Sequence, residues 1–432
     1  MNKSFFCFTA FILQNIYHDR SNIKNILTFE AIFLKLIISI MKKNFVLLAV
    51  LLSFSIIITA QTAYEFKDVK TLKATSVKNQ YRSGTCWSFS GIGFFESELL
   101  RMGKGEYDLS EMFVVRNSYA EKAKKYVRMH GNLNFGGGGA FNDVTSVMDN
   151  IGIVPEEVYK GLEYGTDGHV HGELDKLLKS YMDGVLENKN RELSTAWFKG
   201  LNGLLDAYLG EYPEKFTYKG VEYTPQSFME STGLNMDDYV MLSSFTHHPF
   251  YEPFILEVPD NWGWGEVYNV KMEELTDVID YSIKHDYTVA WATDVSEKGF
   301  QYKKGLAVFP TDDIEDMDNL EQAKWDSFSQ KEKQAFMYDF SSIKTEKKMT
   351  QKLRQEGFDN YQTTDDHGML IAGTAKDQNG KKYYRVKNSW GFENHLYDGY
   401  LYASKTFVQY KTISILVHKD GIPKKLREKL GL

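Results

Sequence analysis

Along the chain, the spacing of apolar side chains changes from that of helices to that of strands. Residues 86–101 carry apolar side chains at the three- and four-residue intervals of a helix with one buried face, namely Phe89, Ile92, Phe94, Phe95, Leu99 and Leu100. Residues 108–111, Asp-Leu-Ser-Glu, have the spacing of a capping box, which predicts that a second helix opens there. The four-glycine run at 136–139 precedes a third, short helix.

From about residue 164 to residue 348 the pattern mixes both periods. It predicts helices at 174–187, 194–208 and 273–285, an extended aromatic stretch at 239–256 and a strand at 288–293. We interpret this part of the chain as an insertion that elaborates the core fold.

Strand patterns dominate the C-terminal part, at residues 369–375, 383–387, 399–403 and 413–417. Asn379 and Gly380 form a turn signal between the first two of these strands. A last helix is expected at 422–430. Since helices dominate before the insertion and strands after it, the sequence predicts an α+β protein with a cleft between a helical lobe and a sheet lobe.

Residues 41–60 have the pattern of a secretory signal peptide, with a basic start, an uncharged stretch and small residues before Gln61. We expect cleavage after Ala60, export to the periplasm or the cell exterior, and no membrane contact afterwards. An uncleaved anchor is the alternative. Residues 1–40 precede this complete signal, so we interpret Met41 as the real start; a genuine extension is the alternative. The mature domain would then be 61–432.

Removal of the signal makes the chain more acidic and leaves it one cysteine. Six of the 51 basic and two of the 58 acidic residues precede residue 61, so 45 basic and 56 acidic residues remain, a net charge of −11. Such acidity argues against nucleic acid as the main partner. Of the two cysteines, Cys7 lies in the removed segment and Cys86 remains. A lone thiol in an exported protein is a candidate reactive group, although an inert buried cysteine is the alternative.

Cys86, His367 and Asn388 together suggest nucleophilic catalysis. Cys86 lies where a loop becomes a helix, and the positive end of the helix dipole favours a thiolate. His367 opens an apolar strand and is the best candidate for a base. Asn388 ends the returning strand of the same hairpin, so it can accept a hydrogen bond from the imidazole and orient it. Trp390 can then cover that bond from water.

The tetrahedral intermediate of acyl transfer also needs hydrogen-bond donors for its oxyanion. Gln80 lies six residues before Cys86 on the loop that enters the helix. Its side-chain amide and the backbone N–H of Cys86 could form a two-donor oxyanion hole.

Three motifs resemble those of papain-like cysteine peptidases. Residues 79–90 carry Asn-Gln and then Ser-Gly-Thr-Cys-Trp-Ser-Phe-Ser, similar to the nucleophile motif. Asp-His-Gly-Met at 366–369 and Lys-Asn-Ser-Trp-Gly at 387–391 resemble the histidine and asparagine motifs. The resemblance implies a two-lobed papain-like fold, peptide substrates, and hydrolysis through an acyl-enzyme at Cys86 with no cofactor and no metal. Gly138 and Gly139 fall where the family has a substrate-binding glycine pair, with Trp390 also bordering the substrate; a plain flexible turn is the alternative for the glycines.

The distance between nucleophile and base indicates one branch of the family. Cys86 and His367 are 281 residues apart, against about 130–150 in short papain-like enzymes. The stretches at 223–228, 235–238 and 290–295 resemble the bleomycin hydrolase (aminopeptidase C) branch, which carries an insertion of this size. The resemblance implies removal of N-terminal residues from peptides, with a ring-shaped homo-hexamer as a possible assembly.

One feature of that branch is not found in this sequence. Its members end in an arm whose terminal carboxylate meets the substrate's amino group, whereas here the sequence ends just after the expected last helix. An endopeptidase or broad-specificity peptidase is therefore the alternative, and an inactive binding scaffold is a remote one. Asp366 is the first candidate for an alternative ammonium ligand.

Two histidine pairs could suggest a metal site. His169, His171 and Glu173 have alternate spacing, which we interpret as a solvated loop rather than a ligand set. The adjacent His247 and His248 are followed by proline and aromatic residues and are expected to pack or to form a surface turn.

Overall fold

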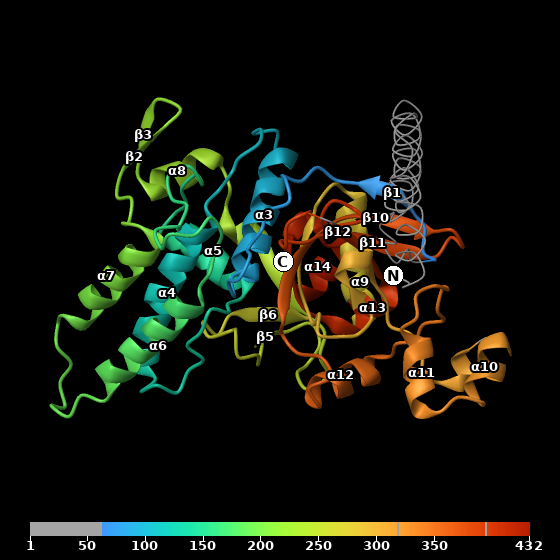
Figure 1. Ribbon diagram of the computed structural model, residues 1–432. Helices are drawn as coiled ribbons and strands as arrows, with labels where there is room; N and C mark the ends of the chain where they lie inside the picture. The colour runs from blue at the N-terminus through green and yellow to red at the C-terminus, as the bar shows by residue number, and fades with distance from the viewer. Residues whose placement is uncertain (1–62, 318, 394) are drawn as a thin grey trace, which may run out of the picture. The chain divides into compact units, whose positions relative to one another are not determined.

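The computed structural model describes residues 63–317, 319–393 and 395–432 (Figure 1). The expected signal peptide and the upstream segment lie outside these residues, so their interpretation stays a prediction. None of the helices in the described part of the chain combines the length and the apolar content needed to cross a membrane.

In the described part of the chain, the first five helices precede every strand except the first one, and the later helices alternate with strands. The helices are α3 Cys86–Arg101, α4 Glu111–Arg128, α5 Phe141–Asn150, α6 Gly172–Leu186, α7 Trp197–Leu209, α8 Pro225–Thr232, α9 Met272–Lys284, α10 Asn319–Trp325, α11 Gln330–Met337, α12 Gln351–Asp359, α13 Lys405–Lys411 and α14 Lys424–Leu430. The strands are β1 Phe66–Thr71, β2 Phe216–Tyr218, β3 Val221–Tyr223, β4 Tyr239–Ser243, β5 Pro253–Ile255, β6 Glu266–Asn269, β7 Val289–Thr293, β8 Phe300–Gln301, β9 Leu306–Ala307, β10 His367–Asp377, β11 Lys382–Lys387, β12 Tyr400–Ser404 and β13 Thr412–His418.

One large mixed sheet carries most of these strands. Its order is β5-β6-β4-β13-β7-β10-β11-β12-β9-β8, and β1 adds to β10. Helices α4 to α8 gather to one side of the sheet, and α3 runs between them and β10 (Figure 1). This arrangement confirms the predicted α+β class; helices α4 to α8 stand to one side of the sheet, whereas α9 and α13 pack against it.

The middle part of the chain contributes to both sides rather than forming a separate unit. Helices α6 and α7 bury Leu174, Leu178, Leu201 and Leu205 in the core beside α4. Strand β7 lies between β10 and β13 in the sheet. The residues assigned to an insertion thus supply central strands of the fold.

Local sequence patterns predicted the main helices, but the bounds of some predicted elements differ from those in the structure. The helix expected at 86–101 begins at Cys86 and ends at Arg101. The second helix is capped by Ser110, whose Oγ accepts the N–H of Phe113, and not by Asp108. The Asp108 carboxylate instead pairs with Lys78 at 2.7 Å. The extended stretch expected at 239–256 divides into β4 and β5, with a loop between them.

Helix α3 and strand β10 approach each other at Gly368. A side chain there would place its Cβ 2.4 Å from Ser90 Oγ and 3.3 Å from the carbonyl oxygen of Cys86. Because Gly368 follows His367 directly, the missing side chain lets the start of β10 lie against the first turn of α3. The site described below depends on this contact.

We expect Gly368→Ala to lower the free energy of unfolding by about 1–3 kcal/mol, because an added methyl group has no room at this contact. Gly184→Ala is the matched control, since Gly184 lies within α6 and its added Cβ meets nothing within 4 Å. The control should stabilise the protein by about 0.5–1 kcal/mol through the higher helix propensity of alanine. Urea unfolding measures the free energy of unfolding of both variants. Equal urea midpoints for Gly368→Ala and the native protein would show that the contact tolerates a side chain.

Candidate active site

Cys86 and His367 line one pocket between α3 and the sheet. Gly139, Asp260, Asp365 and Gly368 also line it. Cys86 is the first residue of α3, and His367 is the first residue of β10. A larger cavity lies elsewhere, around residues 296–362 and 410–411, but its lining includes neither a cysteine nor a histidine. The nucleophile and base expected from the sequence are therefore brought together in one pocket.

The hydrogen bonds of Asn388 determine the tautomer of His367. Asn388 Oδ1 lies 2.7 Å from His367 Nε2 and also accepts the backbone N–H of Ser389 at 2.7 Å. An oxygen that accepts the Ser389 bond cannot be a donor, so Nε2 of the neutral imidazole must carry the proton. His367 Nδ1 is then the nitrogen that can accept a proton. The geometry has the form expected of an oriented base.

Trp390 packs against this pair. Its ring centroid lies 4.6 Å from that of His367, with the planes tilted by 35°. Phe300 and Tyr302 contact its edge at 6.0 and 5.0 Å between centroids. The indole therefore covers the imidazole from one side while 37% of its own surface stays exposed.

Two hydrogen bonds fix the side chain of Gln80. Its Nε2 donates to the carbonyl of Ser83 at 2.9 Å, and its Oε1 accepts from the Ser389 hydroxyl at 2.6 Å. Gln80 is buried and is not among the residues that line the pocket. The side chain links the loop before Cys86 to the segment after Asn388, and the one bond that its Nε2 donates, to Ser83, leaves the second amide N–H free to donate.

The two expected substrate glycines lie in a tightly packed loop. A Cβ on Gly138 would come within 2.0 Å of Asp260, and one on Gly139 within 2.8 Å of the Trp87 ring. Gly139 lines the pocket, whereas Gly138 does not. The packing argues for a fixed loop at the pocket edge rather than a freely flexible turn.

Burial favours the neutral forms of both reacting groups. It raises the pKa of the Cys86 thiol above its usual range, and the negative charges of Asp365 and Asp260 raise it further. Hydrogen bonds from the backbone of Gly368 and Trp87 oppose this shift. Burial also lowers the pKa of His367 to about 4, against the opposing bond to Asn388. These shifts favour a neutral thiol and a neutral imidazole, and for Cys86 they oppose the effect of the helix dipole.

Three carboxylates lie around the pocket, and the sequence had indicated only Asp366. Asp260 accepts from Asn134 Nδ2 at 2.9 Å, and Asp366 accepts from the Thr364 hydroxyl at 2.8 Å. The pKa of Asp365 is raised to about 7, mainly by burial and in smaller part by the charges of Asp260 and Asp366. Asp365 could have been identified from the sequence, because it directly precedes the histidine motif. Nothing in the sequence marks Asp260, because it reaches the pocket from a distant loop.

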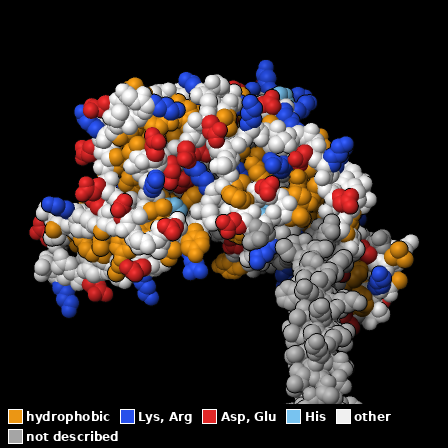
Figure 2. Space-filling model, turned by 45° about the horizontal axis from the view of Figure 1, so that its top comes forward, with side chains coloured by type: hydrophobic (Ala, Val, Ile, Leu, Met, Phe, Trp, Pro, Cys, Tyr) orange, Lys and Arg blue, Asp and Glu red, His pale blue; other side chains and the backbone are white. Residues whose placement is uncertain are grey.

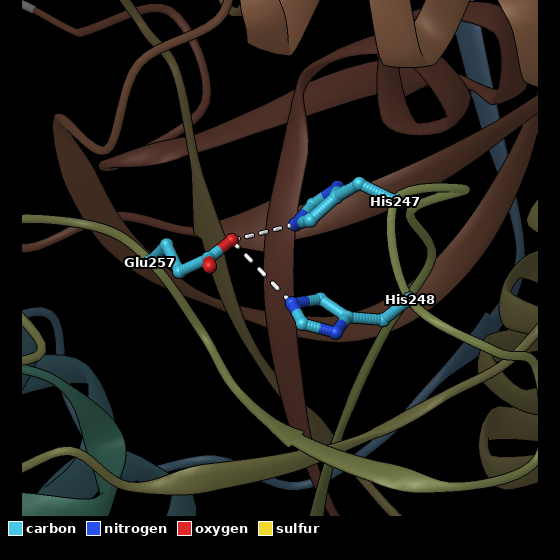
Figure 3. A group of neighbouring side chains, drawn as sticks. All are labelled: His247, His248 and Glu257. Atoms are coloured by element: carbon cyan, nitrogen blue, oxygen red, sulfur yellow. Dashed lines mark ion pairs between the residues drawn. The ribbon is translucent and has the colours of Figure 1, made fainter.

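His247, His248 and Glu257 form the one group in the described part of the chain that has metal-ligand spacing (Figure 3). His247 Nε2 lies 2.8 Å from Glu257 Oε2, and His248 Nε2 lies 3.5 Å from it. Gln355 fixes the tautomer: its Oε1 accepts the N–H of Thr246, so its Nε2 faces His247 Nδ1 at 3.0 Å as a donor. His247 Nε2 then carries a proton and donates to Glu257, which is unlike a metal ligand. The group is a polar surface contact, as expected of a packed turn.

The other histidine pair corrects an expectation. His169 and His171 are buried, not solvated, because their backbone pairs with the loop before Cys86 through Arg82. Glu173 is exposed and accepts instead from the Tyr208 hydroxyl. These three side chains do not converge on a common point.

A family model gives the comparison that decides the family. The model of the Peptidase C1-like family matches residues 114–431. The chain belongs to the Peptidase C1-like family. This membership confirms the resemblance to papain-like cysteine peptidases that the three motifs indicated.

Relatives within the Peptidase C1-like family carry aminopeptidase names. Aminopeptidase C of Lactococcus lactis subsp. cremoris is 24% identical over 386 residues, which cover 80% of each chain. Aminopeptidase E of Lactobacillus helveticus is 24% identical over 401 residues, which cover 83% of this chain and 84% of the relative. The crystal structure of PepW from Lactobacillus rhamnosis HN001 superposes with a TM-score of 0.63 at 18% identity over 84% of each chain, which shows a shared fold. The two named aminopeptidases agree with the aminopeptidase C branch that the sequence resembles.

We expect Asp365→Asn to lower the pKa of the Cys86 thiol by about one unit, because it removes a negative charge from the pocket. The rate of alkylation by iodoacetamide, followed between pH 6 and pH 10 with Cys86→Ala as the background, reports the thiolate fraction. Asp286→Asn is the control, since its exposed carboxylate pairs with Lys70 at the surface. An unchanged alkylation profile in Asp365→Asn would contradict the charge assignment.

Proposed function

We propose that this protein is an exported cysteine aminopeptidase that releases N-terminal residues from peptides through an acyl-enzyme at Cys86. The observation that carries the proposal is the pocket in which an oriented imidazole and a helix-terminal thiol meet beside three carboxylates. Export rests on the signal pattern at residues 41–60 alone, and the possible hexamer rests on the family resemblance alone.

The chemistry needs only side chains and backbone of this chain. Cys86 Sγ attacks the peptide carbonyl as its proton passes to His367 Nδ1. The same imidazolium then protonates the departing amine, which leaves a thioester on Cys86. Water, deprotonated by His367, hydrolyses the thioester and restores the thiol. Asn388 keeps Nε2 protonated throughout, so that Nδ1 stays in line with the reaction.

Stabilisation of the oxyanion is assigned to the helix N-terminus. The backbone N–H of Cys86 belongs to the first turn of α3, where backbone donors have no partner within the helix. The remaining N–H of Gln80 is the second candidate donor. Because Gln80 is held by Ser83 and Ser389, this role requires the tetrahedral oxygen to lie close to the loop before Cys86.

The carboxylates favour substrates with a free amino group. In such a substrate the ammonium nitrogen is two bonds from the scissile carbonyl carbon, about 2.5 Å away. When that carbon lies at Cys86, the ammonium therefore falls within the pocket that Asp260 and Asp365 line. A cation there gains Coulomb energy from both groups, whereas an internal peptide offers a neutral amide at the same position. We assign ammonium binding to Asp260 and Asp365, with Asp366 at the exposed rim.

The nucleophile and its base are tested by three substitutions, read with aminoacyl-coumarin amides. We expect Cys86→Ala to abolish turnover, because no other group in the scheme can form the acyl-enzyme. Asn388→Ala should keep more activity than His367→Ala, because it disturbs the orientation of the base without removing it. Turnover in Cys86→Ala, or equal loss in the other two variants, would contradict these roles.

Free-amino and N-acetylated versions of one substrate test the aminopeptidase assignment. The native enzyme should prefer the free-amino form, and Asp260→Asn with Asp365→Asn should reduce kcat/KM for that form by about tenfold or more, the value of one lost ion pair in a partly buried site. The acetylated form should not suffer, which separates ammonium binding from altered thiol reactivity. Asp286→Asn should change neither rate. Equal cleavage of both forms by the native enzyme would instead indicate an endopeptidase or a broad-specificity peptidase.

A further inference from the structure

A buried lysine that the proposed chemistry does not use holds the glycine loop. Lys122 lies in α4 and is 1% exposed. Its Nζ donates to the carbonyl of Gly136 at 2.8 Å and, through a short bond, to that of Gly138. Within the described residues no carboxylate lies at ion-pair distance from it. Its direct hydrogen-bond partners are therefore backbone carbonyls of the loop.

The carbonyl between these two is held as well. Gly137 O accepts from Trp87 Nε1 at 3.1 Å, and the Tyr119 hydroxyl lies 3.5 Å from it. Trp87 directly follows Cys86 in α3. Three consecutive loop carbonyls are thus fixed by side chains of α3 and α4. Because a four-glycine run has little conformational preference of its own, these bonds determine where Gly139 stands at the pocket edge.

Several charged groups face Lys122, and each is engaged elsewhere. Asp143 of α5 accepts from the N–H of Ala140 and from Trp262 Nε1, both at 2.9 Å. Asp175 of α6 contacts the Tyr119 hydroxyl at 3.4 Å, and Asp260 accepts from Asn134. Burial lowers the pKa of Lys122 to about 8, while the charges of Asp143, Asp260 and Asp175 oppose the shift.

The lowered pKa of Lys122 determines how its titration changes the free energy of unfolding with pH. Between pH 8 and the ordinary lysine value of 10.5, the unfolded chain binds more protons than the folded one, so stability rises with pH across that range. At neutral pH the buried ammonium therefore costs stability through its desolvation. The benefit of Lys122 must therefore come from the loop carbonyls to which it donates.

We propose that Lys122 is a positioning residue that keeps the Gly136–Gly139 loop in the conformation required for a peptide to bind beside Cys86. This inference rests on the proposed function, because it assigns the loop to the substrate of the same site. Lys122 touches no reacting atom. It acts through the loop, so its loss should weaken substrate binding and leave the chemistry of the bound complex in place.

The test compares Lys122→Met with Lys124→Met. Lys124 of the same helix is partly exposed and pairs with Glu121, so it controls for loss of a lysine from α4. Lys122→Met should raise KM by about tenfold or more, the value of charged hydrogen bonds lost at a binding loop, with kcat within about threefold of the native value. Its melting temperature at pH 7 should not fall, because the substitution removes a buried charge. Lys124→Met should change none of these quantities.

Two readouts do not depend on turnover. Hydrogen exchange measured by mass spectrometry should show faster exchange of the 136–139 amides in Lys122→Met, and alkylation of Cys86 should be unchanged. In a Cys86→Ala background, Lys122→Met should weaken binding of an uncleaved peptide by the same factor as KM. If the native enzyme hydrolyses no peptide, the proposed function fails, while exchange of the loop still decides the role of Lys122.

A pH series separates positioning from general structure. As pH rises through about 8, Lys122 loses its charge and KM of the native enzyme should rise. Lys122→Arg keeps its charge over this range and should show a smaller rise. The substrate's amino group titrates in the same way with the native enzyme and with Lys122→Arg. A difference between the two in the rise of KM is therefore due to residue 122. Unchanged KM and loop exchange in Lys122→Met would overturn the inference, as would failure of Lys122→Met and Lys122→Gln to fold, which would make Lys122 a structural residue.

Discussion

The contact between the first turn of α3 and the start of β10 determines the rest of the site. Gly368 makes it, because any side chain there would overlap Ser90. Ser90 Oγ in turn donates to the carbonyl of Cys86 at 2.6 Å, which fixes the same turn of the helix from within. Cys86 and His367 are 281 residues apart in sequence, and this glycine contact is what brings them to one pocket.

A buried ionic cluster holds the segment that leads into α3. Lys78 pairs with Glu96 at 3.2 Å and with Glu111 at 2.7 Å, and both carboxylates are almost fully buried. Burial raises the pKa of Glu111 to about 7 in spite of Lys78, so part of the cost of desolvation is not recovered by the pairing. The cluster ties the loop that carries Gln80 to α3 and α4. In Figure 2, acidic and basic side chains are interspersed over the face in view, in contrast to this buried group.

What could be predicted from the sequence was set by short-range constraints. Helix α3 follows from its apolar spacing, and the pairing of His367 with Asn388 follows from a hairpin that separates them by only 21 residues. The burial of His171 and the bond of Gln80 to Ser389 were not predictable, because each depends on a partner outside its own segment. Asp260 and Lys122 belong to the same class: a loop after β5 and a helix side chain reach the site only once the helices have packed against the sheet. The family resemblance supplied the residues that bear the chemistry, but not those that shape the pocket around them.

The pocket carboxylates have opposite effects on the substrate and on the nucleophile. In the proposed function their charge attracts a substrate ammonium, but it also adds to the burial that raises the pKa of the Cys86 thiol. A bound ammonium would neutralise Asp260 and Asp365 electrostatically and thereby remove part of the field that opposes the thiolate. A free-amino substrate would in this way promote deprotonation of its own nucleophile, whereas a peptide without that charge would leave the thiol protonated. Preference for a free amino terminus would then appear in kcat as well as in KM, since the ammonium contributes both to binding and to formation of the attacking thiolate.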